Sequence, residues 1–359
     1  MPDIAPTAVL PPDLHYVDDT QPGITRKKQR GQFCYFDPAG RRINDQDEVK
    51  RIDALAIPPA YSDVWICADP RGHVQATGRD ARGRKQYRYH ARWREVRDAS
   101  KFSRLHSFGQ ALPKLRKQLE AMISTPGYSR DKVMATVMTL LDETLIRVGN
   151  HQYARDNRSF GLTTLRNRHV EVSGATITFQ FRGKSGVEHQ VSVKDRRLAR
   201  IIKRCLEIPG QDLFQYLDED GARHTVSSSD VNACLKSLTG ADFTAKDYRT
   251  WAGSALALSM LRQLQWEPEA EARRHVTDVV KAVARHLGNT PAVCRECYIH
   301  PAVLEGFLEG GLAQLPRPRA RKGLKVEEVG LAMFLERHLR TAETASPGQG
   351  PAKAVRDRT

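Results

Sequence analysis

The sequence lacks the long apolar runs of a membrane protein. No stretch of the 359 residues approaches the roughly eighteen consecutive apolar residues that a membrane-spanning helix requires. Residues 1 to 4 show neither the basic start nor the apolar run of a secretory signal peptide. A GxxxxGKS/T phosphate loop and a clustered acidic metal motif are also absent. We therefore expect a cytoplasmic protein without membrane association, nucleotide-binding loop or carboxylate-bound metal.

Cysteine is scarce as well. Among the six cysteines, only Cys294 and Cys297 have the spacing of a CxxC pair. A structural zinc site would need a second close pair or histidines at ligand spacing, and neither follows in the sequence. We expect both thiols to remain reduced and to pack against a helix face.

Basic residues, by contrast, are abundant, and the formal net charge is +15. Such a charge indicates a polyanionic partner, usually nucleic acid, although a solvated basic surface would give the same total. Residues 75 to 94 concentrate this charge, and Tyr87 and Tyr89 are interleaved with the basic side chains. This combination favours a surface on β-strands that lies on DNA.

The length and the pattern of the chain predict two domains and an α+β fold. Strand-like runs occur at 32–36, 63–68 and 73–78, with a short helix between Asp45 and Leu55, whereas helical patterns dominate later. The charged stretch 94–104 is a candidate hinge. The expected parts are a flexible lead (1–20), a small β-rich DNA-binding domain (21–97), a mainly α-helical catalytic domain (98–315) and a basic, partly disordered tail with one amphipathic segment (316–359).

Within the expected catalytic domain, turn and cap signals place several polar residues at the ends of elements. Ser129 can cap a helix that runs to about Arg147 and ends at Gly149. Three alternating runs between 169 and 193 predict a β-meander with Lys184 at a glycine-flanked hairpin tip. Thr244 can cap a helix that carries Lys246 and Arg249 one turn apart. Another helix spans about 269–287, and Thr290 and Pro291 begin a short helix, which leaves Asn289 in the elbow and Tyr298 two turns later.

Two arginines, a lysine on a tight turn and a late tyrosine suit transesterification of a phosphodiester. Arginine donates parallel hydrogen bonds to a phosphate and keeps its charge, whereas lysine can also give up a proton. Each residue alone has a commoner role: surface ion pairs for Arg147 and Arg249, an exposed turn for Lys184, and an interfacial aromatic for Tyr298. Their order along the chain favours the catalytic interpretation.

The same residues lie in five motifs that resemble those of type IB DNA topoisomerases. The motifs are QATGRDARGRKQYRYHARW (75–93), IRVGNHQYARDNRSFGLTTL (146–165), FRGKSG (181–186), KDYRTW (246–251) and GNTPAVCRECY (288–298). Together they are similar to the short bacterial branch, which resembles the poxvirus enzyme, and the resemblance covers about residues 20–315. Five ordered matches are far more specific than one.

The resemblance implies a role for each residue. Tyr298 would attack phosphorus and form a 3′-phosphotyrosyl link, Arg147 and Arg249 would stabilise the transition state, and Lys184 would protonate the leaving 5′ oxygen. Lys246 would contact the phosphate region. Asn289 stands where the poxvirus-like and eukaryotic enzymes use histidine; an amide can donate to a non-bridging oxygen but cannot become cationic.

The resemblance also implies a clamp around double-stranded DNA. The expected enzyme is a nucleoid-associated monomer that relaxes positive and negative supercoils and needs no cofactor, neither metal nor nucleotide. The N-terminal residues expected to contact DNA, with the two glutamines as candidates for contacts to base edges, are Gln75, Arg84, Lys85, Gln86, Tyr87, Arg88 and Tyr89.

Two other functions remain open at this point. Tyrosine recombinases share the catalytic fold, but they usually read HxxR where this chain has Lys246 and Arg249, and they carry a helical N-terminal domain where residues 30–90 predict strands. A DNA-binding protein without enzymatic activity would explain the charge and the aromatic residues. It would not explain five ordered motifs that end in tyrosine.

Overall fold

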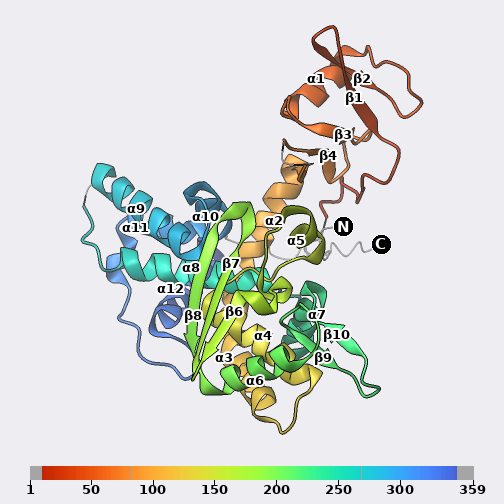
Figure 1. Ribbon diagram of the computed structural model, residues 1–359. Helices are drawn as coiled ribbons and strands as arrows, with labels where there is room; N and C mark the ends of the chain where they lie inside the picture. The colour runs from red at the N-terminus through yellow and green to blue at the C-terminus, as the bar shows by residue number, and fades with distance from the viewer. Residues whose placement is uncertain (1–9, 82, 268, 346–359) are drawn as a thin grey trace, which may run out of the picture. The chain divides into compact units, whose positions relative to one another are not determined.

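The protein has two compact units (Figure 1). A computed structural model describes residues 10–81, 83–267 and 269–345. The N-terminal unit comprises residues 1–103 and 150–159, and the C-terminal unit comprises 104–149 and 160–359. Strands form the core of the first unit and helices dominate the second, so the predicted α+β class is confirmed.

The N-terminal unit is built on one antiparallel sheet with the strand order β2-β1-β3-β4-β5. The strands are β1 (Ile24–Gln29), β2 (Gln32–Phe36), β3 (Ser62–Ile66), β4 (Val74–Arg79) and β5 (Lys85–Tyr89). Helix α1 (Gln46–Ala54) begins where the carboxylate of Asp45 accepts hydrogen bonds from two backbone amides of the first turn. Ile52 of α1 packs on Ile24 and Ile66 of the sheet. The predicted strands and the short helix are therefore confirmed, because each follows a local pattern.

Residues 10–20 differ from the expected flexible lead. Leu14 and Val17 are buried, and the backbone amide of Val17 donates to His73 Nδ1 at 3.1 Å. Leu14 packs on Trp93, while Val17 packs on Cys67 and its neighbours. The expectation is wrong for this segment because two apolar side chains, spaced three apart among prolines and acids, are buried against Trp93 and against Cys67 and Val74. Residues 1–9 lie outside the described part of the chain.

The predicted hinge at 94–104 is a helix. Helix α2 (Ala91–Ser103) continues through it, and the division between the units falls after Ser103 rather than at 97. Helix α5 (His151–Asn157) belongs by its contacts to the N-terminal unit, although the sequence placed it in the catalytic domain. Tyr153 of α5 contacts Arg84, and this pairing between distant segments leaves no local signal in the sequence.

The C-terminal unit consists of helices with a three-stranded antiparallel meander. The strands are β6 (Val170–Ser173), β7 (Thr176–Arg182) and β8 (Glu188–Lys194), and a small hairpin adds β9 (Gln215–Leu217) and β10 (Arg223–Thr225). The helices are α3 (Leu105–Ser124), α4 (Arg130–Thr144), α6 (Arg196–Glu207), α7 (Ser228–Thr239), α8 (Ala245–Leu261), α9 (Glu269–Leu287), α10 (Pro291–Cys297), α11 (Pro301–Leu308) and α12 (Val326–Ala345). Strands β7 and β8 pair from Thr176–Lys194 to Arg182–Glu188, which confirms the predicted meander.

Helices α4 and α8 run through the centre of the C-terminal unit. Val133, Val137 and Leu141 of α4 are fully buried, and only 1% of the surface of Trp251 and of Leu258 on α8 is exposed. A helix buried on most sides is a rigid support for residues at its ends. Two of the residues described below lie near the ends of these helices: Arg147 follows α4, and Arg249 lies in the N-terminal part of α8.

Helix α12 belongs to the core rather than to an appended tail. Leu331 and Leu335 are buried, and Glu328 accepts hydrogen bonds from Arg116 Nη1 and Nη2 at 2.7 and 2.8 Å. The predicted amphipathic segment is confirmed. The prediction of a partly disordered tail is wrong for residues 326–345, because the apolar face of α12 packs against α3 and α8. Residues 346–359 lie outside the described range.

All six cysteines are free thiols. Cys294 is fully buried, and burial raises the pKa of its thiol to about 11, in agreement with the packing role expected from the sequence. No helix among the described residues is long and apolar enough to cross a membrane.

Candidate active site

Arg147 lies on a loop that follows α4, not on the helix itself. The helix ends at Thr144, three residues before the expected position, because Leu145 adopts the left-handed conformation with φ of 56°. Two backbone hydrogen bonds fix the loop: Leu162 N donates to Arg147 O at 2.8 Å and Thr163 N donates to Val148 O at 2.7 Å. These bonds hold the backbone at Arg147 and at the residue that follows it.

Arg249 is the buried cation of the site. Only 4% of its surface is exposed, and its two terminal nitrogens donate to Leu145 O and, at 2.7 Å, to Leu287 O. These carbonyls lie at the C-terminal ends of α4 and α9, where unpaired carbonyls and the helix dipole favour a cation. Burial lowers the pKa of Arg249, Arg147 lowers it further, and the phenol of Tyr298 opposes the shift.

Tyr298 ends the short helix α10. Thr290 caps this helix, Pro291 takes its first position, and Tyr298 follows its last residue. Its ring centroid lies 5.0 Å from Arg249 Cζ. Ser254, on the same helix as Arg249, donates to the carbonyl of Tyr298 at 3.4 Å. Helix α8 thus contacts the tyrosine at two levels, through the guanidinium at its ring and through a hydroxyl at its backbone.

Asn289 joins the group through Arg147. Its Oδ1 accepts a hydrogen bond from Arg147 Nη2, which also donates to Gly288 O at 3.1 Å. Because Oδ1 accepts, the amide nitrogen Nδ2 is left as a donor. Nδ2 of Asn289 and Nε of Arg249 are buried, and neither has a hydrogen-bond partner among the residues described. Two buried donors without acceptors suit the non-bridging oxygens of a phosphate.

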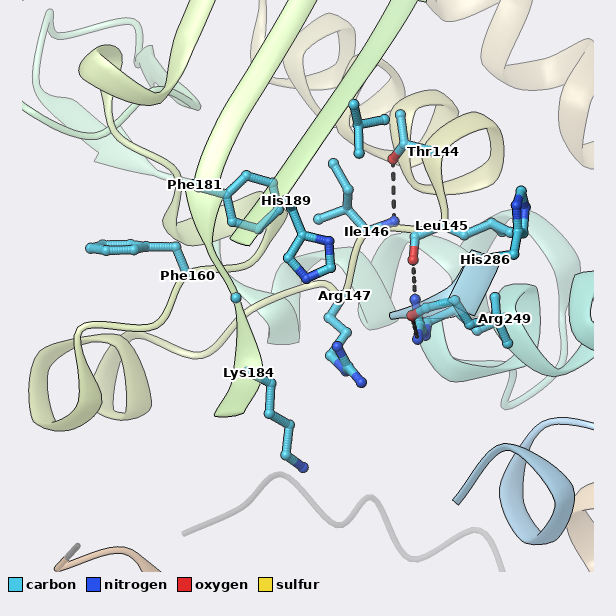
Figure 2. Close-up of a pocket in the computed structure, with 13 residues that line it drawn as sticks. Thr144, Leu145, Ile146, Arg147, Phe160, Phe181, Lys184, His189, Arg249 and His286 are labelled. Carbon is cyan, nitrogen blue, oxygen red and sulfur yellow. Dashed lines mark hydrogen bonds between the residues drawn. The ribbon is translucent and has the colours of Figure 1, made fainter. Parts of the chain in front are cut away.

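Lys184 lies at the tip of the β7–β8 hairpin, as the glycine-flanked turn predicts. A single 3-10 turn (Lys184–Gly186) forms this tip, and Lys184 is exposed. Lys184 lines one pocket together with Arg147, Arg249 and His189 (Figure 2). In Figure 2 the side chains of Arg147 and Lys184 extend in the same direction from this pocket.

Lys246 lies one turn before Arg249 on α8 but is separated from the pocket. Its side chain is exposed whereas that of Arg249 is buried, and it does not line the pocket that contains Lys184. Among the described residues, no group of three or more histidines, cysteines, aspartates or glutamates is arranged to hold a metal ion. The structure therefore brings together Arg147, Arg249, Asn289 and Tyr298, with Lys184 at the rim.

Gln75, a candidate for a contact to base edges, lies inside the N-terminal unit rather than on its surface. It is 97% buried in the N-terminal unit, where Nε2 donates to Gly72 O at 2.7 Å and to Pro70 O at 3.0 Å. Its Oε1 accepts from Arg51 Nη1 at 2.8 Å. Its amide is hydrogen-bonded to the turn between β3 and β4, so the side chain stabilises that turn, and contact with DNA stays a prediction for it.

The other N-terminal candidates lie on or beside the edge strand β5 and make internal contacts. Arg84 Nη2 and Gln86 Nε2 bind Asp80 Oδ2 at 2.7 and 3.0 Å, and Lys85 pairs with Asp19. Arg88 Nη2 donates to Ala56 O at 2.8 Å, while Tyr87 and Tyr89 stack with ring centroids 6.0 Å apart. These contacts fix the orientation of the side chains, and contact with DNA remains a prediction for them.

The sequence reasoning missed His189, whose ring lines the same pocket. A signal was present, because His189 is in phase with Val191 and Val193 on the inward side of β8. A histidine at a strand position otherwise occupied by apolar residues is unusual and indicates a candidate functional residue. Ser254 was missed as well, and its pattern gives no such signal, since small residues are common on buried helices.

Comparisons with known proteins identify the family of the chain. The model of the eukaryotic DNA topoisomerase I catalytic core matches residues 90–309, and that of the bacterial DNA topoisomerase IB N-terminal domain matches 32–80. The DNA topoisomerase 1B of Acanthamoeba polyphaga mimivirus is 33% identical over 79% of this chain and 87% of its own. The DNA topoisomerase 1B of Vaccinia virus (strain Copenhagen) is 24% identical over 68% of this chain and 75% of its own. The core match exceeds half of the chain, and the chain therefore belongs to the type IB DNA topoisomerases.

Proposed function

We propose that this enzyme relaxes positive and negative supercoils by cleaving one DNA strand, holding its 3′ end on Tyr298, and resealing it. The phenol oxygen attacks phosphorus, the bond to the 5′ oxygen breaks, and the free strand rotates before the reverse reaction. The phosphotyrosyl link conserves the energy of the broken bond, so resealing needs no ATP. The enzyme would act as a monomer that closes around double-stranded DNA in the nucleoid.

One observation carries this proposal: Arg249, whose guanidinium lies beside the Tyr298 ring, and Asn289, which binds Arg147, each hold a buried donor without an acceptor in the described part of the chain. Nε of Arg249 and Nδ2 of Asn289 have no acceptor among the described residues, and Arg147 is hydrogen-bonded to Asn289. Negative charge that develops on non-bridging oxygens would be stabilised by donors already in place, with no reorganisation at the moment of reaction.

Arg249 also supports the attack by Tyr298. A free phenol has a pKa of about 10 and is mostly protonated at neutral pH, so the nucleophile must lose its proton to water or a base as it attacks. The guanidinium of Arg249, 5.0 Å from the ring centroid, favours the developing phenolate over the phenol. This interaction strengthens as charge grows, which is the requirement for faster chemistry.

Lys184 is the proposed proton donor to the leaving 5′ oxygen. It lies on a hairpin tip at the rim of the pocket that Arg147 and Arg249 also line. In Figure 2 its side chain extends in the same direction as that of Arg147. Lys246, exposed on α8, would contact a neighbouring phosphate, and the β5 residues, with Arg84, would hold the duplex in the N-terminal unit.

Plasmid relaxation tests the proposal directly. Purified protein is incubated with supercoiled plasmid in EDTA without ATP, beside Tyr298→Phe and the matched control Tyr248→Phe. The Tyr248 hydroxyl is buried on α8 without a hydrogen-bond partner among the described residues, so its removal should leave activity intact. Relaxation by the wild type and the control, but not by Tyr298→Phe, is the expected result.

Other outcomes would change the assignment. An SDS-stable protein–DNA adduct that persists in Tyr298→Phe would remove Tyr298 as the nucleophile. Covalent capture restricted to a defined inverted-repeat site, without relaxation, would indicate a recombinase. Binding without any covalent product would leave only a DNA-binding protein.

A further inference from the structure

His189 occupies an apolar position of strand β8 beside the proposed active site. Its ring stacks on Phe181 of β7 with centroids 5.0 Å apart and an interplanar angle of 11°. Figure 2 shows the imidazole turned into the pocket above Arg147. A half-buried polar ring among apolar neighbours requires a structural or functional reason.

The imidazole is wedged between two glycines that precede proposed catalytic residues. A Cβ at Gly183, next to Lys184, would lie 2.5 Å from His189 Cδ2 and Nε2. A Cβ at Gly288, next to Asn289, would lie 2.7 Å from Cε1 of the same ring. Real Cβ atoms do not approach other atoms so closely, so glycine at both positions allows one ring to touch both segments.

The backbone conformation of Gly183 does not itself explain the glycine at this position. Its φ of −92° and ψ of −167° are extended values that any residue can adopt, so backbone conformation does not require glycine there. Gly183 N donates to Val187 O at 2.7 Å, which fixes the base of the tip carrying Lys184. The ring contact is thus the feature that excludes a side chain at this position.

The charges around the ring favour its neutral form. Burial lowers the pKa of His189, Arg147 and Arg249 lower it further, and Glu188 opposes them. Lys184 and His286 line the same pocket. Near neutral pH the ring is therefore an uncharged spacer that adds no third cation beside the guanidinium groups.

We infer that His189 is a positioning residue for Lys184: its ring fixes the tip of the β7–β8 hairpin against the Gly288–Asn289 elbow, which places the lysine on the leaving oxygen. This inference rests on the proposed function. Losing the wedge would leave the tyrosine and arginines in place and allow the hairpin tip to shift. A shift on the order of 1 Å at a catalytic group costs about 10²-fold in rate.

The leaving group provides the readout. Single-turnover cleavage is measured on a DNA substrate with the natural 5′ oxygen and on one with a 5′-phosphorothiolate, whose sulfur leaves without protonation. His189→Ala should slow cleavage of the oxygen substrate by about 10²-fold and of the sulfur substrate far less, so the sulfur-to-oxygen rate ratio rises. A general loss of folded protein slows both substrates equally and cancels in this ratio.

Four further variants make the test specific. Gly183→Ala places a methyl group against the His189 ring and displaces it, so this variant should raise the sulfur-to-oxygen ratio as well. His189→Phe keeps a planar ring and should give a ratio close to the wild-type value. His189→Ala added to Lys184→Ala should slow the oxygen substrate little further, because both act through one proton transfer. His169→Ala is the matched control, since His169 is another buried histidine of this unit, and it should leave the ratio unchanged.

An unchanged ratio in His189→Ala would overturn the inference, as would a ratio in His189→Phe as high as that of the alanine variant. Additive losses in the double variant would also overturn it, because the two residues would then act separately. If the wild type forms no covalent adduct on either substrate, the proposed function itself fails, which is a distinguishable result.

Discussion

The contact between Gly253 and Tyr298 gives a sharp prediction about how α8 positions the nucleophile. Gly253 lies one turn after Arg249, and a Cβ there would lie 2.6 Å from the carbonyl oxygen of Tyr298 and 3.1 Å from Leu287 Cδ1. The leucine side chain can turn aside. The backbone of Tyr298 must shift as a whole, because α10 precedes it and the amide of His300 donates to Ser254 Oγ at 2.9 Å.

The size of the shift sets the expected loss of activity. An ordinary C···O contact is about 3.3 Å, so Gly253→Ala requires a displacement of about 0.7 Å between α8 and Tyr298. A displacement of this order at a reacting group should slow cleavage by about 10- to 100-fold. The loss should appear in the single-turnover rate of adduct formation, with DNA affinity retained.

Stability should respond differently from activity. Alanine is more favourable than glycine inside a helix by about 0.5–1 kcal/mol, which offsets part of the steric cost of Gly253→Ala. The free energy of unfolding should therefore change little while the rate falls. This separation distinguishes a misplaced nucleophile from a partly unfolded protein.

Gly330→Ala is the matched control. Gly330 lies on α12, where a Cβ would meet no described atom closer than 3.7 Å, so the substitution should raise stability by about 0.5–1 kcal/mol and leave cleavage unchanged. Both variants are compared by thermal unfolding and by covalent capture on a labelled duplex. A Gly253→Ala enzyme that cleaves at the wild-type rate would refute the idea that this contact positions Tyr298.

Three further predictions follow from other contacts. Asn289→Ala removes one buried donor and should lower the cleavage rate by about 10²- to 10³-fold with little change in DNA affinity; an unchanged rate would leave Asn289 as a helix-stop residue. Gln75→Ala should lower the free energy of unfolding by about 1–3 kcal/mol and leave the affinity for DNA unaltered, and a lower affinity in the folded variant would indicate that Gln75 contacts DNA. Arg116→Ala leaves Asp142 and Glu328 without their shared cation and should lower the free energy of unfolding by about 3–5 kcal/mol. Burial raises the pKa of Glu328 but Arg116 lowers it more, so this stabilisation is present above about pH 4.3 and lost as the pH falls through the folded pKa; melting temperatures that fall equally with pH in both proteins would contradict this.

Boundaries set by local chemistry were predictable from the sequence. The cap residues Asp45, Ser129 and Thr290 each accept from backbone amides at the predicted helix start. The end of α4 was not predictable, because Leu145 is a left-handed residue without the glycine that usually marks one. Its carbonyl is bound by Arg249 from 104 residues away, so a distant cation meets the unpaired end of the helix.

The placement of residues was predictable where a motif carried them. Arg249 lies beside the Tyr298 ring and lines one pocket with Arg147, and the catalytic roles of all three remain proposals. The burial of Gln75 was not predictable, because its amide is hydrogen-bonded to the carbonyls of a neighbouring turn, a geometry that composition does not encode. The docking of α12 likewise depends on Glu328 and Arg116, which are 212 residues apart.

Arg249 shows why the fold and the proposed chemistry of this site cannot be separated. Its terminal nitrogens bind the carbonyls of Leu145 and Leu287, so the same guanidinium that faces Tyr298 also joins the ends of α4 and α9. A lysine could neutralise charge at this point, but a single ammonium cannot span two carbonyls and present a third donor in the same plane. Loss of activity on substitution of Arg249 therefore combines two effects, and only a parallel measurement of stability can separate the anion-binding role from the joining of the two helices.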